Sequence, residues 1–269
     1  MQIKRIGRIH YLAAEFNGSP GSIQGFTTRH EGVSRPPYNS LNLGTTTLDQ
    51  QHSVEGNRSL LMTAFGVAED SLLTARQVHG SDILIIDTPN EDVSHFLSVE
   101  SDAIITNQPG LMIGVCVADC VPILLLDPEK QVVAAVHAGW QGTAGRLTAK
   151  TVSAMKSHFG CDPASLQAAI GPCISPCCYE VDAPVRHSFL QSGLPWDAVA
   201  VASGEGKWKL DLAATNRQLL ISAGVPATAI QSADMCVSCQ RELFFSHRRD
   251  NGETGRQMGF IMLKSVQGS

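Results

Sequence analysis

The chain has 269 residues, 43% of them hydrophobic and 17% charged, which excludes an intrinsically disordered protein and allows a sizeable core. Twenty basic and twenty-five acidic residues give a net charge of -5, which argues against a general electrostatic grip on nucleic acid or an anionic membrane. The opening MQIKRIGRIHYLAAEF contains no apolar stretch of signal-peptide length, and no run is long enough to span a bilayer. We therefore expect a cytoplasmic protein without nucleic-acid or membrane partners, whose eight cysteines stay reduced.

Strand-like segments dominate the first half of the chain. The predicted strands are residues 22–30, 81–87, 102–107, 111–118, 121–127 and 131–137. Several of them are apolar throughout, which is typical of strands that are covered on both faces. Between the first two, residues 57–65 predict a helix that ends at Gly66.

The second half of the chain is predicted to be more helical. After Trp140, apolar residues recur on one side of a helix, and the helix is predicted to end at Gly160 and Pro163; these apolar residues are Ala144, Leu147, Val152, Met155 and Phe159. A further helix is predicted from Asp211, as its N-cap, to Ala223, with Gly224 ending it. Residues 255–264 predict a final strand. The pattern indicates an α+β fold of layered sheets covered by helices, in a single domain over residues 1–269.

Three segments end a strand-like run with a potential ligand for a soft metal. They are RQVHG with His79, VADCVP with Cys120 and AVHAGW with His137. A thiolate and two imidazoles suit zinc, and three protein ligands leave a fourth position open, as in catalytic sites. The spacing matches no short-range zinc pattern, so a buried cysteine and two ordinary histidines remain the alternative.

Two segments are candidates to bind an anion. Gly139, Gly142 and Gly145 surround the start of a predicted helix, whose free N–H groups and dipole favour negative charge. A tight turn that requires glycine is the alternative. The closing segment FFSHRRD…GRQ carries arginines, among them Arg248 and Arg256, which can hold phosphate bidentately or simply form a solvated loop.

The remaining cysteines predict no site. Cys236 and Cys239 have the two-residue gap of zinc knuckles, but no second C-x-x-C pair accompanies them, which favours buried or incidental thiols. Cys173, Cys177 and Cys178 lie in PCISPCC, where the gap of three residues and the lack of an H-x-E partner exclude the zinc deaminase signature.

Seven segments, taken together and in order, carry a resemblance. They are FTTRHEGVSRPPYNSLNLG, the NR at residues 57–58, RQVHG, ADCVPILL, VHAGWQGT, IGPCISPCCYEV and FFSHRRD…GRQMGFI. From about Gly25 to Leu263 the chain resembles the YfiH-like family, also called the laccase-domain or multicopper polyphenol oxidase family. The resemblance implies a four-layer α/β/β/α sandwich with mixed sheets. It also implies a zinc site made of His79, Cys120 and His137.

The laccase name conflicts with the histidine pattern. Multicopper oxidases assemble their copper centres from several H-x-H pairs, and the nine histidines of this chain form none. Copper can occupy a single site of this donor type, since it binds more tightly than zinc in general. We therefore expect Zn²⁺ as the cofactor and Cu²⁺ as an alternative occupant.

The resemblance implies a zinc-dependent phosphorylase of purine nucleosides (adenosine, inosine, guanosine and methylthioadenosine) that also deaminates adenosine at the same site. The residues expected to serve catalysis are His79, Cys120, His137 and Asp119, and those expected to bind nucleoside or phosphate are Asn42, Arg58, Gly142, Thr143 and Arg248. Asp119 would support the cysteine ligand or handle protons, unless it only forms a turn.

Two other hypotheses use the same residues. In the first, Cys120 is paired with His137 and attacks an amide carbonyl, as a cysteine hydrolase that edits peptidoglycan precursors would do. In the second, the chain binds a metal as a partner protein and turns over no nucleoside. A metal-bound thiolate reacts slowly with alkylating agents and an activated free thiolate reacts fast, which distinguishes the first hypothesis from the zinc enzyme.

Overall fold

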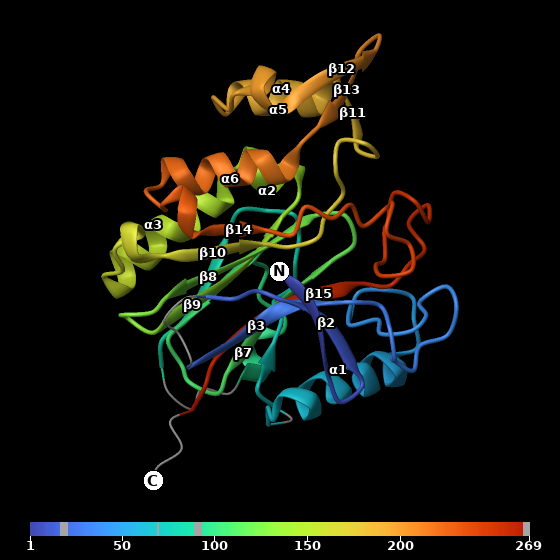
Figure 1. Cartoon of the computed structure of the whole chain (residues 1–269), viewed down its shortest axis with the longest axis vertical. Helices are drawn as coiled ribbons and strands as arrows, with labels where there is room; N and C mark the ends of the chain where they lie inside the picture. The colour runs from blue at the N-terminus through green and yellow to red at the C-terminus, as the bar shows by residue number, and fades with distance from the viewer. Residues whose placement is uncertain (17–20, 69, 89–92, 266–269) are drawn as a thin grey trace.

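Two six-stranded sheets form the centre of the computed structural model, which describes residues 1–16, 21–68, 70–88 and 93–265 (Figure 1). The first sheet has the order β1-β2-β3-β15-β7-β4. Its strands are β1 (Gln2–Ile6), β2 (Ile9–Ala13), β3 (Ser22–Thr27), β15 (Gln257–Leu263), β7 (Met112–Val117) and β4 (Leu72–Leu73). All neighbours are antiparallel except β4 and β7, so the predicted final strand lies in the middle of a mixed sheet.

The second sheet has the order β14-β10-β8-β9-β6-β5. Its strands are β14 (Ile230–Ser232), β10 (Gln167–Ile170), β8 (Val121–Asp127), β9 (Val132–Ala138), β6 (Ala103–Thr106) and β5 (Ile83–Ile86). The two edge pairs are parallel and the inner pairs are antiparallel. The hairpin of β8 and β9 pairs Pro122 with His137, which brings the segment around Cys120 beside the end of β9.

The two sheets pack face to face, and β15 shows how the sequence directs this. Ile261 and Leu263 point into the core between the sheets, where they join Leu124 and Val133 of the second sheet. Met258 and Phe260, with the opposite parity, point to the outer face of the first sheet. Both faces of β15 are therefore covered, which explains why the strand is apolar along its whole length.

Helices cover the two outer faces. Helix α1 (Gln51–Phe65) lies on the first sheet, and α2 (Trp140–Ala144), α3 (Leu147–Phe159) and α6 (Leu212–Ser222) lie over the second (Figure 1). The order of layers is thus helix, sheet, sheet, helix. This confirms the predicted four-layer α+β sandwich with mixed sheets.

A small third sheet with the order β11-β13-β12 stands at the periphery beyond α6, and the sequence did not predict it (Figure 1). Its elements are β11 (Glu180–Asp182), β12 (Ala200–Gly204), β13 (Lys207–Leu210), α4 (Ala183–Gln191) and α5 (Trp196–Val199). Trp196 makes edge-on contacts with Phe189 and Trp208, at centroid distances of 5.7 and 5.8 Å. These aromatic contacts attach the sheet to its helices.

The predicted end of α1 at Gly66 and the predicted start of α6 at Asp211 are confirmed, whereas the start of α1 and the helix after Trp140 differ from the prediction. Gly66 adopts the left-handed conformation, with φ 66°, and ends α1, although that helix begins earlier than predicted, at Gln51. Asp211 caps α6 by accepting the N–H of Ala214 at 2.8 Å. The helix predicted after Trp140 is instead divided into α2 and α3, because Arg146 between them has φ 57°.

Three short 3-10 helices complete the described chain. They are Val93–Phe96, Pro163–Ser165 and Ala227–Ala229. Across the described residues, none of the helices combines the length and apolar character needed to cross a membrane.

Candidate functional site

Three predicted ligands converge although they come from three separate segments. His79 lies between β4 and β5, Cys120 lies in the turn before β8, and His137 lies in β9. One ligand atom from each can be chosen so that all lie within 4.8 Å of one another. The two imidazoles meet edge to face, with centroids 4.8 Å apart. The side chains predicted to share a metal are therefore close enough to do so.

Asp102, just before β6, orients two of these ligands. Its carboxylate accepts the N–H groups of Val78, His79 and Gly80 at 3.2, 3.0 and 2.6 Å. These bonds stabilise the left-handed conformation of His79, with φ 61°, which is rare for a residue with a side chain. Asp102 also bonds Nδ1 of His137 at 2.7 Å, which leaves Nε2 to face a metal.

Sequence reasoning missed Asp102. The residue is fully buried, and it directly precedes the fully buried strand β6 (Ala103–Thr106). A carboxylate at such a position needs a buried partner, and this was the available signal. In metal sites a carboxylate behind a histidine ligand fixes the tautomer and the ring orientation.

The charges within the cluster favour a thiolate. Desolvation would raise the pKa of Cys120, but His137 and His79 outweigh it and lower that pKa to about 6. Desolvation would lower the pKa of His137, but the Cys120 sulfur and Asp102 raise it to about 9. A thiolate with two imidazoles is the donor set of a soft divalent metal such as zinc, and the residues therefore fit that ion.

The glycine-rich turn after His137 serves close packing. A Cβ on Gly139 would lie 3.1 Å from Sγ of Cys120 and 3.2 Å from Cδ2 of His79. A Cβ on Gly142 would lie 3.1 Å from the carbonyl oxygen of Gly80. The turn and the segment that carries His79 can approach each other this closely because both glycines lack a side chain.

Gly142 and Thr143, predicted to bind phosphate, lie behind the cluster. Thr143 is fully buried in α2, and its hydroxyl accepts a hydrogen bond from Nδ2 of Asn216 in α6 at 2.9 Å. Neither residue is among those that line the cavity at the cluster. The Thr143 contact joins α2 to α6, and Gly142 allows α2 to pack closely against the segment of Gly80.

A cavity of about 460 Å³ opens at the three ligands. Its polar and aromatic lining comprises Thr45, Thr46, Thr74, Gln77, Trp140, Gln141, Tyr179, His247, Arg248 and Arg256, beside the ligands and Asp119. Its size lies within the usual range for small-molecule sites. Two guanidinium groups and a metal-binding cluster thus share one cavity.

Asp119, which precedes the cysteine ligand, holds the loop that carries Arg248. Its carboxylate accepts the hydroxyl of Ser246 and the backbone N–H of Arg248, each at 2.6 Å. The Arg248 guanidinium donates to the carbonyl oxygen of Glu180 at 2.9 Å and lies over the ring of Tyr179 at 5.1 Å. Since both carboxylate oxygens of Asp119 accept hydrogen bonds, the geometry favours positioning over proton transfer.

Asn42 stands behind the opposite wall of the cavity and is fully buried. Its Oδ1 accepts the N–H groups of Gly44 and Arg256 at 3.1 and 2.9 Å, and its Nδ2 donates to Thr47 and Asp49 at 2.9 Å. Asn42 does not line the cavity, but Gly44 and Arg256 do. It therefore holds two parts of the wall together.

The arginines predicted to bind phosphate occupy different places. Arg58 projects from α1 toward the carbonyl oxygens of Leu43 and Leu72, at 3.4 Å each, and does not line the cavity. Burial lowers the pKa of its guanidinium. Arg248 and Arg256 both line the cavity.

Gln77 is a further cavity residue that the sequence did not predict. Its side-chain amide donates to the carbonyl oxygen of Cys116 at 2.9 Å and accepts the N–H of Cys116 at 2.8 Å. This pair of hydrogen bonds attaches the segment before His79 to strand β7. A local sequence motif cannot predict this contact, because Gln77 and Cys116 are distant in sequence.

The fold and the site together define an α+β sandwich protein whose cavity contains three residues that could hold a metal. The chain belongs to the family described as multi-copper polyphenol oxidoreductase laccase, whose model matches residues 23–264. The family assignment made from the sequence motifs is thereby confirmed.

Similar proteins carry the names of nucleoside enzymes. A purine nucleoside phosphorylase, YlmD of Geobacillus stearothermophilus, is 38% identical over 250 residues, which cover 90% of each chain. An adenosine deaminase, RL5 of an unknown prokaryotic organism, is 36% identical over 93% of this chain and 97% of its own. The crystal structure of YlmD from Geobacillus stearothermophilus matches with a TM-score of 0.89 and 35% identity, over 98% of this chain and 99% of that one.

Proposed function

We propose that the protein is a zinc-dependent purine nucleoside phosphorylase. One observation carries the proposal: His79, Cys120 and His137 converge at a cavity of about 460 Å³ that Arg248 and Arg256 also line. The names of the similar proteins support the same class of reaction. Adenosine, inosine, guanosine and methylthioadenosine are the proposed substrates, with phosphate as the second substrate.

The metal is proposed to bind to the two imidazoles and the thiolate. Zinc in this donor set supplies Lewis-acid chemistry and an open coordination position, and Cu²⁺ is an alternative occupant. Asp102 keeps Nε2 of His137 free for coordination, because it bonds Nδ1. Gly139 leaves the room that Cys120 and His79 need to approach each other.

Phosphate is proposed to bind to Arg248, with Arg256 across the cavity. Guanidinium groups recognise phosphate oxygens with two parallel hydrogen bonds, and a partly desolvated site strengthens such bonds. Arg248 is already held in place through Asp119 at its backbone and through Glu180 at its side chain. Arg58 does not line the cavity, which favours Arg248 as the phosphate ligand.

The proposed reaction exchanges one bond at C1′ of the ribose. A phosphate oxygen forms a bond to C1′ while the bond from C1′ to the purine nitrogen breaks. The purine leaves with the electron pair of that bond and takes up a proton. Arg248 and Arg256 hold the attacking phosphate close to C1′, so that orientation contributes to the rate.

Adenosine deamination is a second proposed activity of the same cavity, because one similar protein is named an adenosine deaminase. Water then supplies the oxygen at C6 of the purine, ammonia leaves, and inosine is formed. This reaction needs no phosphate, so its dependence on Arg248 should be weak. The two activities can therefore be distinguished experimentally by their dependence on phosphate and on Arg248.

The cysteine hydrolase hypothesis is not favoured. A thiolate–imidazole pair needs one histidine, whereas both His79 and His137 contact the Cys120 sulfur. Two imidazoles on one thiolate are typical of a metal site. A metal-binding protein without turnover remains as an outcome of the test below.

The cytoplasm is the proposed location, because thiol ligands stay available where thiols are kept reduced. The metal is bound by Cys120 as a thiolate, and oxidation of that sulfur would remove the site. The proposal thus links the location to the chemistry of the cluster.

The test incubates the zinc-loaded protein with adenosine, with and without phosphate, and follows the products by chromatography. Phosphate-dependent release of adenine, lost in Cys120→Ala together with one zinc, would support the phosphorylase. Phosphate-independent inosine would add the deaminase. If no nucleoside reacts, the phosphorylase proposal is overturned. Fast alkylation of Cys120 in the metal-free protein would then favour the hydrolase, and stable zinc binding would favour the partner protein.

A further inference from the structure

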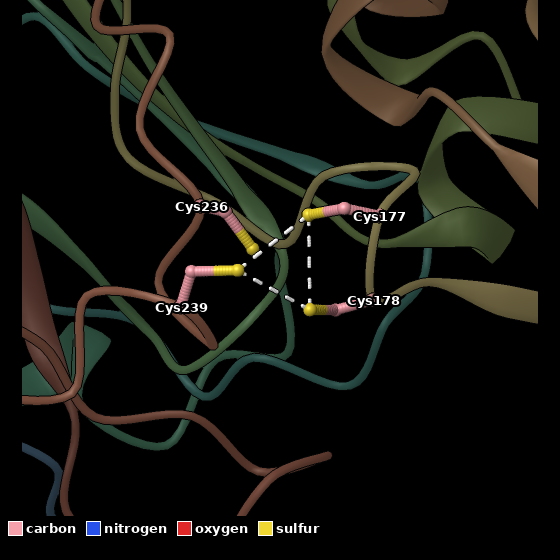
Figure 2. A group of neighbouring side chains, drawn as sticks. All are labelled: Cys177, Cys178, Cys236 and Cys239. Atoms are coloured by element: carbon pink, nitrogen blue, oxygen red, sulfur yellow. Dashed lines mark hydrogen bonds between the residues drawn. The ribbon is translucent and has the colours of Figure 1, made fainter.

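Four cysteines outside the cavity cluster meet at one point. Cys177 and Cys178 lie in the loop between β10 and β11, and Cys236 and Cys239 lie in the loop after β14. Their sulfur atoms all lie within 4.8 Å of one another, and the side chains point to a common centre (Figure 2). The sequence interpretation of Cys236 and Cys239 as buried or incidental thiols rested on the lack of a second C-x-x-C pair, and it did not foresee that Cys177 and Cys178 lie beside them.

The distances between the sulfurs match metal ligands. Sγ of Cys177 lies 3.7 Å from Cys178 and 3.6 Å from Cys239, and Cys178 lies 3.5 Å from Cys239. Sulfurs at about 2.3 Å from a central zinc form a tetrahedron with edges of about 3.8 Å. A disulfide needs a separation of about 2.05 Å. These three separations are thus close to the edges of a tetrahedral thiolate site, and the Cys236 sulfur lies within 4.8 Å of the other three.

The backbone around Cys236 is arranged for a thiolate. The N–H of Ser175 lies 3.5 Å from the Cys236 sulfur. An N–H group directed at a sulfur stabilises a thiolate ligand, so this contact suits a Cys236 sulfur that is bound to a metal.

We propose that Cys177, Cys178, Cys236 and Cys239 form a second zinc site, separate from the cavity cluster. Four protein ligands fill the tetrahedral preference of zinc, as in structural sites, and soft thiolates select zinc over calcium or magnesium. Binding releases the thiol protons to solvent and changes no oxidation state. This site has no open position, and its role is structural.

The proposed site joins two loops that support the cavity wall. Cys236 forms an isolated parallel bridge with Cys173, and the N–H of Val237 donates to the Cys173 carbonyl at 3.0 Å. Nη1 of Arg249 donates to the Val237 carbonyl at 2.9 Å, which connects the C-x-x-C turn to the segment of Arg248. Tyr179 of the cavity lining follows directly after Cys178. A metal here would fix both loops at once.

The first experiment counts zinc per chain. Protein expressed with zinc and passed through a desalting column is analysed by elemental mass spectrometry. We expect two equivalents in the unchanged protein, one in Cys120→Ala, and one in the double variant Cys177→Ser/Cys239→Ser. Both positions of the double variant are exposed, so serine there leaves the core intact. Cys161→Ala, at a buried cysteine outside both clusters, is the matched control and should keep two equivalents.

The second experiment identifies the ligands. Cobalt-loaded Cys120→Ala protein should show an intense thiolate-to-cobalt charge-transfer band and tetrahedral visible bands, which are lost when Cys177→Ser and Cys239→Ser are added. Zinc loss from Cys177→Ser/Cys239→Ser should also lower the melting temperature by about 5–15 °C, with the native circular dichroism retained at low temperature.

Two results would overturn the proposed second site. One is a single zinc equivalent in the unchanged protein that the double variant keeps. The other is an intact mass, measured under alkylating conditions, that shows Cys177 or Cys178 in a disulfide. Neither readout depends on nucleoside turnover, so failure of the second site is distinct from failure of the phosphorylase proposal.

Discussion

The two cysteine-containing clusters of this chain differ in both ligands and surroundings. The cavity cluster combines one sulfur with two imidazoles; Cys120 and His137 lie next to or in buried strands of the second sheet, and His79 lies on the segment between β4 and β5. The four-cysteine cluster uses sulfur alone, and its residues lie on loops near the surface. A carboxylate, Asp102, orients the first, whereas in the second the backbone N–H of Ser175 is directed at the Cys236 sulfur.

The cavity cluster is therefore suited to catalysis, and the four-cysteine cluster is suited to structural support of the loops. Three ligands beside a cavity leave space for a substrate atom, and rigid strands hold two of them in place. Four thiolates leave no such space, but they can connect loops that have few buried contacts of their own. The predictions below change one cluster at a time. Each can contradict this division, which assigns catalysis to the cavity cluster and structural support to the four-cysteine cluster.

The largest effect is expected from Cys120→Ala. The change removes the thiolate that both histidines contact, so we expect phosphorolysis to fall by about 1,000-fold or more. The rate of adenine release and the zinc content are measured on the same sample. One zinc should remain, held by the four cysteines. Loss of all zinc would show that the clusters depend on each other and would contradict the division.

Asp102→Asn tests how the cavity cluster is oriented. The amide can no longer accept every hydrogen bond that the carboxylate accepts, and the ring of His137 loses its charged partner. We expect the affinity of the cavity site for zinc to fall by about 10–100-fold, measured by competition with a chelator. The four-cysteine site should be unaffected.

The chain offers a matched control for this change. Asp87 bonds Nε2 of His158 at 2.7 Å, the same length as the contact between Asp102 and His137, but the Asp87 pair is partly exposed at the surface. Asp87→Asn should leave both zinc sites unchanged. An equal loss of affinity in the two variants would assign the effect to general destabilisation.

The sequence predicted the three cavity residues as a set through the family resemblance. Their positions after strand-like runs made them candidates, but their spacing matches no short-range zinc pattern and left buried or ordinary residues as the alternative. Asp102 could not be predicted in this way, since an aspartate before a strand is common and its partners lie on distant segments. The cysteine cluster was missed for a similar reason: its two pairs are separated by 58 to 62 residues, and only one pair has a two-residue gap.

The strands and helices show the same limit: local sequence patterns predict buried elements, but not features that depend on contacts between distant segments. Buried strands such as β8 and β9 were predicted because both faces are covered. β1 and most of β12 are exposed, so they carry no hydrophobic alternation that would mark them. The break at Arg146 was missed because it depends on the glycine turn that packs against the His79 segment, a tertiary contact.

Arg248→Ala tests the segment that lies between the two clusters. Asp119, next to the cavity cysteine, holds its backbone, and Arg249 connects it to the C-x-x-C turn. Losing charge-assisted bonds to phosphate should raise the KM for phosphate by about 10–30-fold, with both zinc equivalents retained. Steady-state kinetics at varied phosphate measure this effect. Arg58→Met, at a similar volume but away from the cavity, should leave that KM unchanged; a rise there instead would move the phosphate site to α1.

The smallest effect is expected from Gly139→Ala. The added Cβ would lie 3.1 Å from Sγ of Cys120 and 3.2 Å from the ring of His79, so both ligands must shift by a few tenths of an ångström. A shift of this size costs about 1 kcal/mol, which predicts a fall of about fivefold in the zinc affinity of the cavity site. Chelator competition in Gly160→Ala, whose Cβ meets nothing within 4 Å, controls for loss of stability alone. An unchanged affinity in Gly139→Ala would mean that the ligands tolerate movement, and that the rigidity assigned to the cavity cluster does not set its affinity.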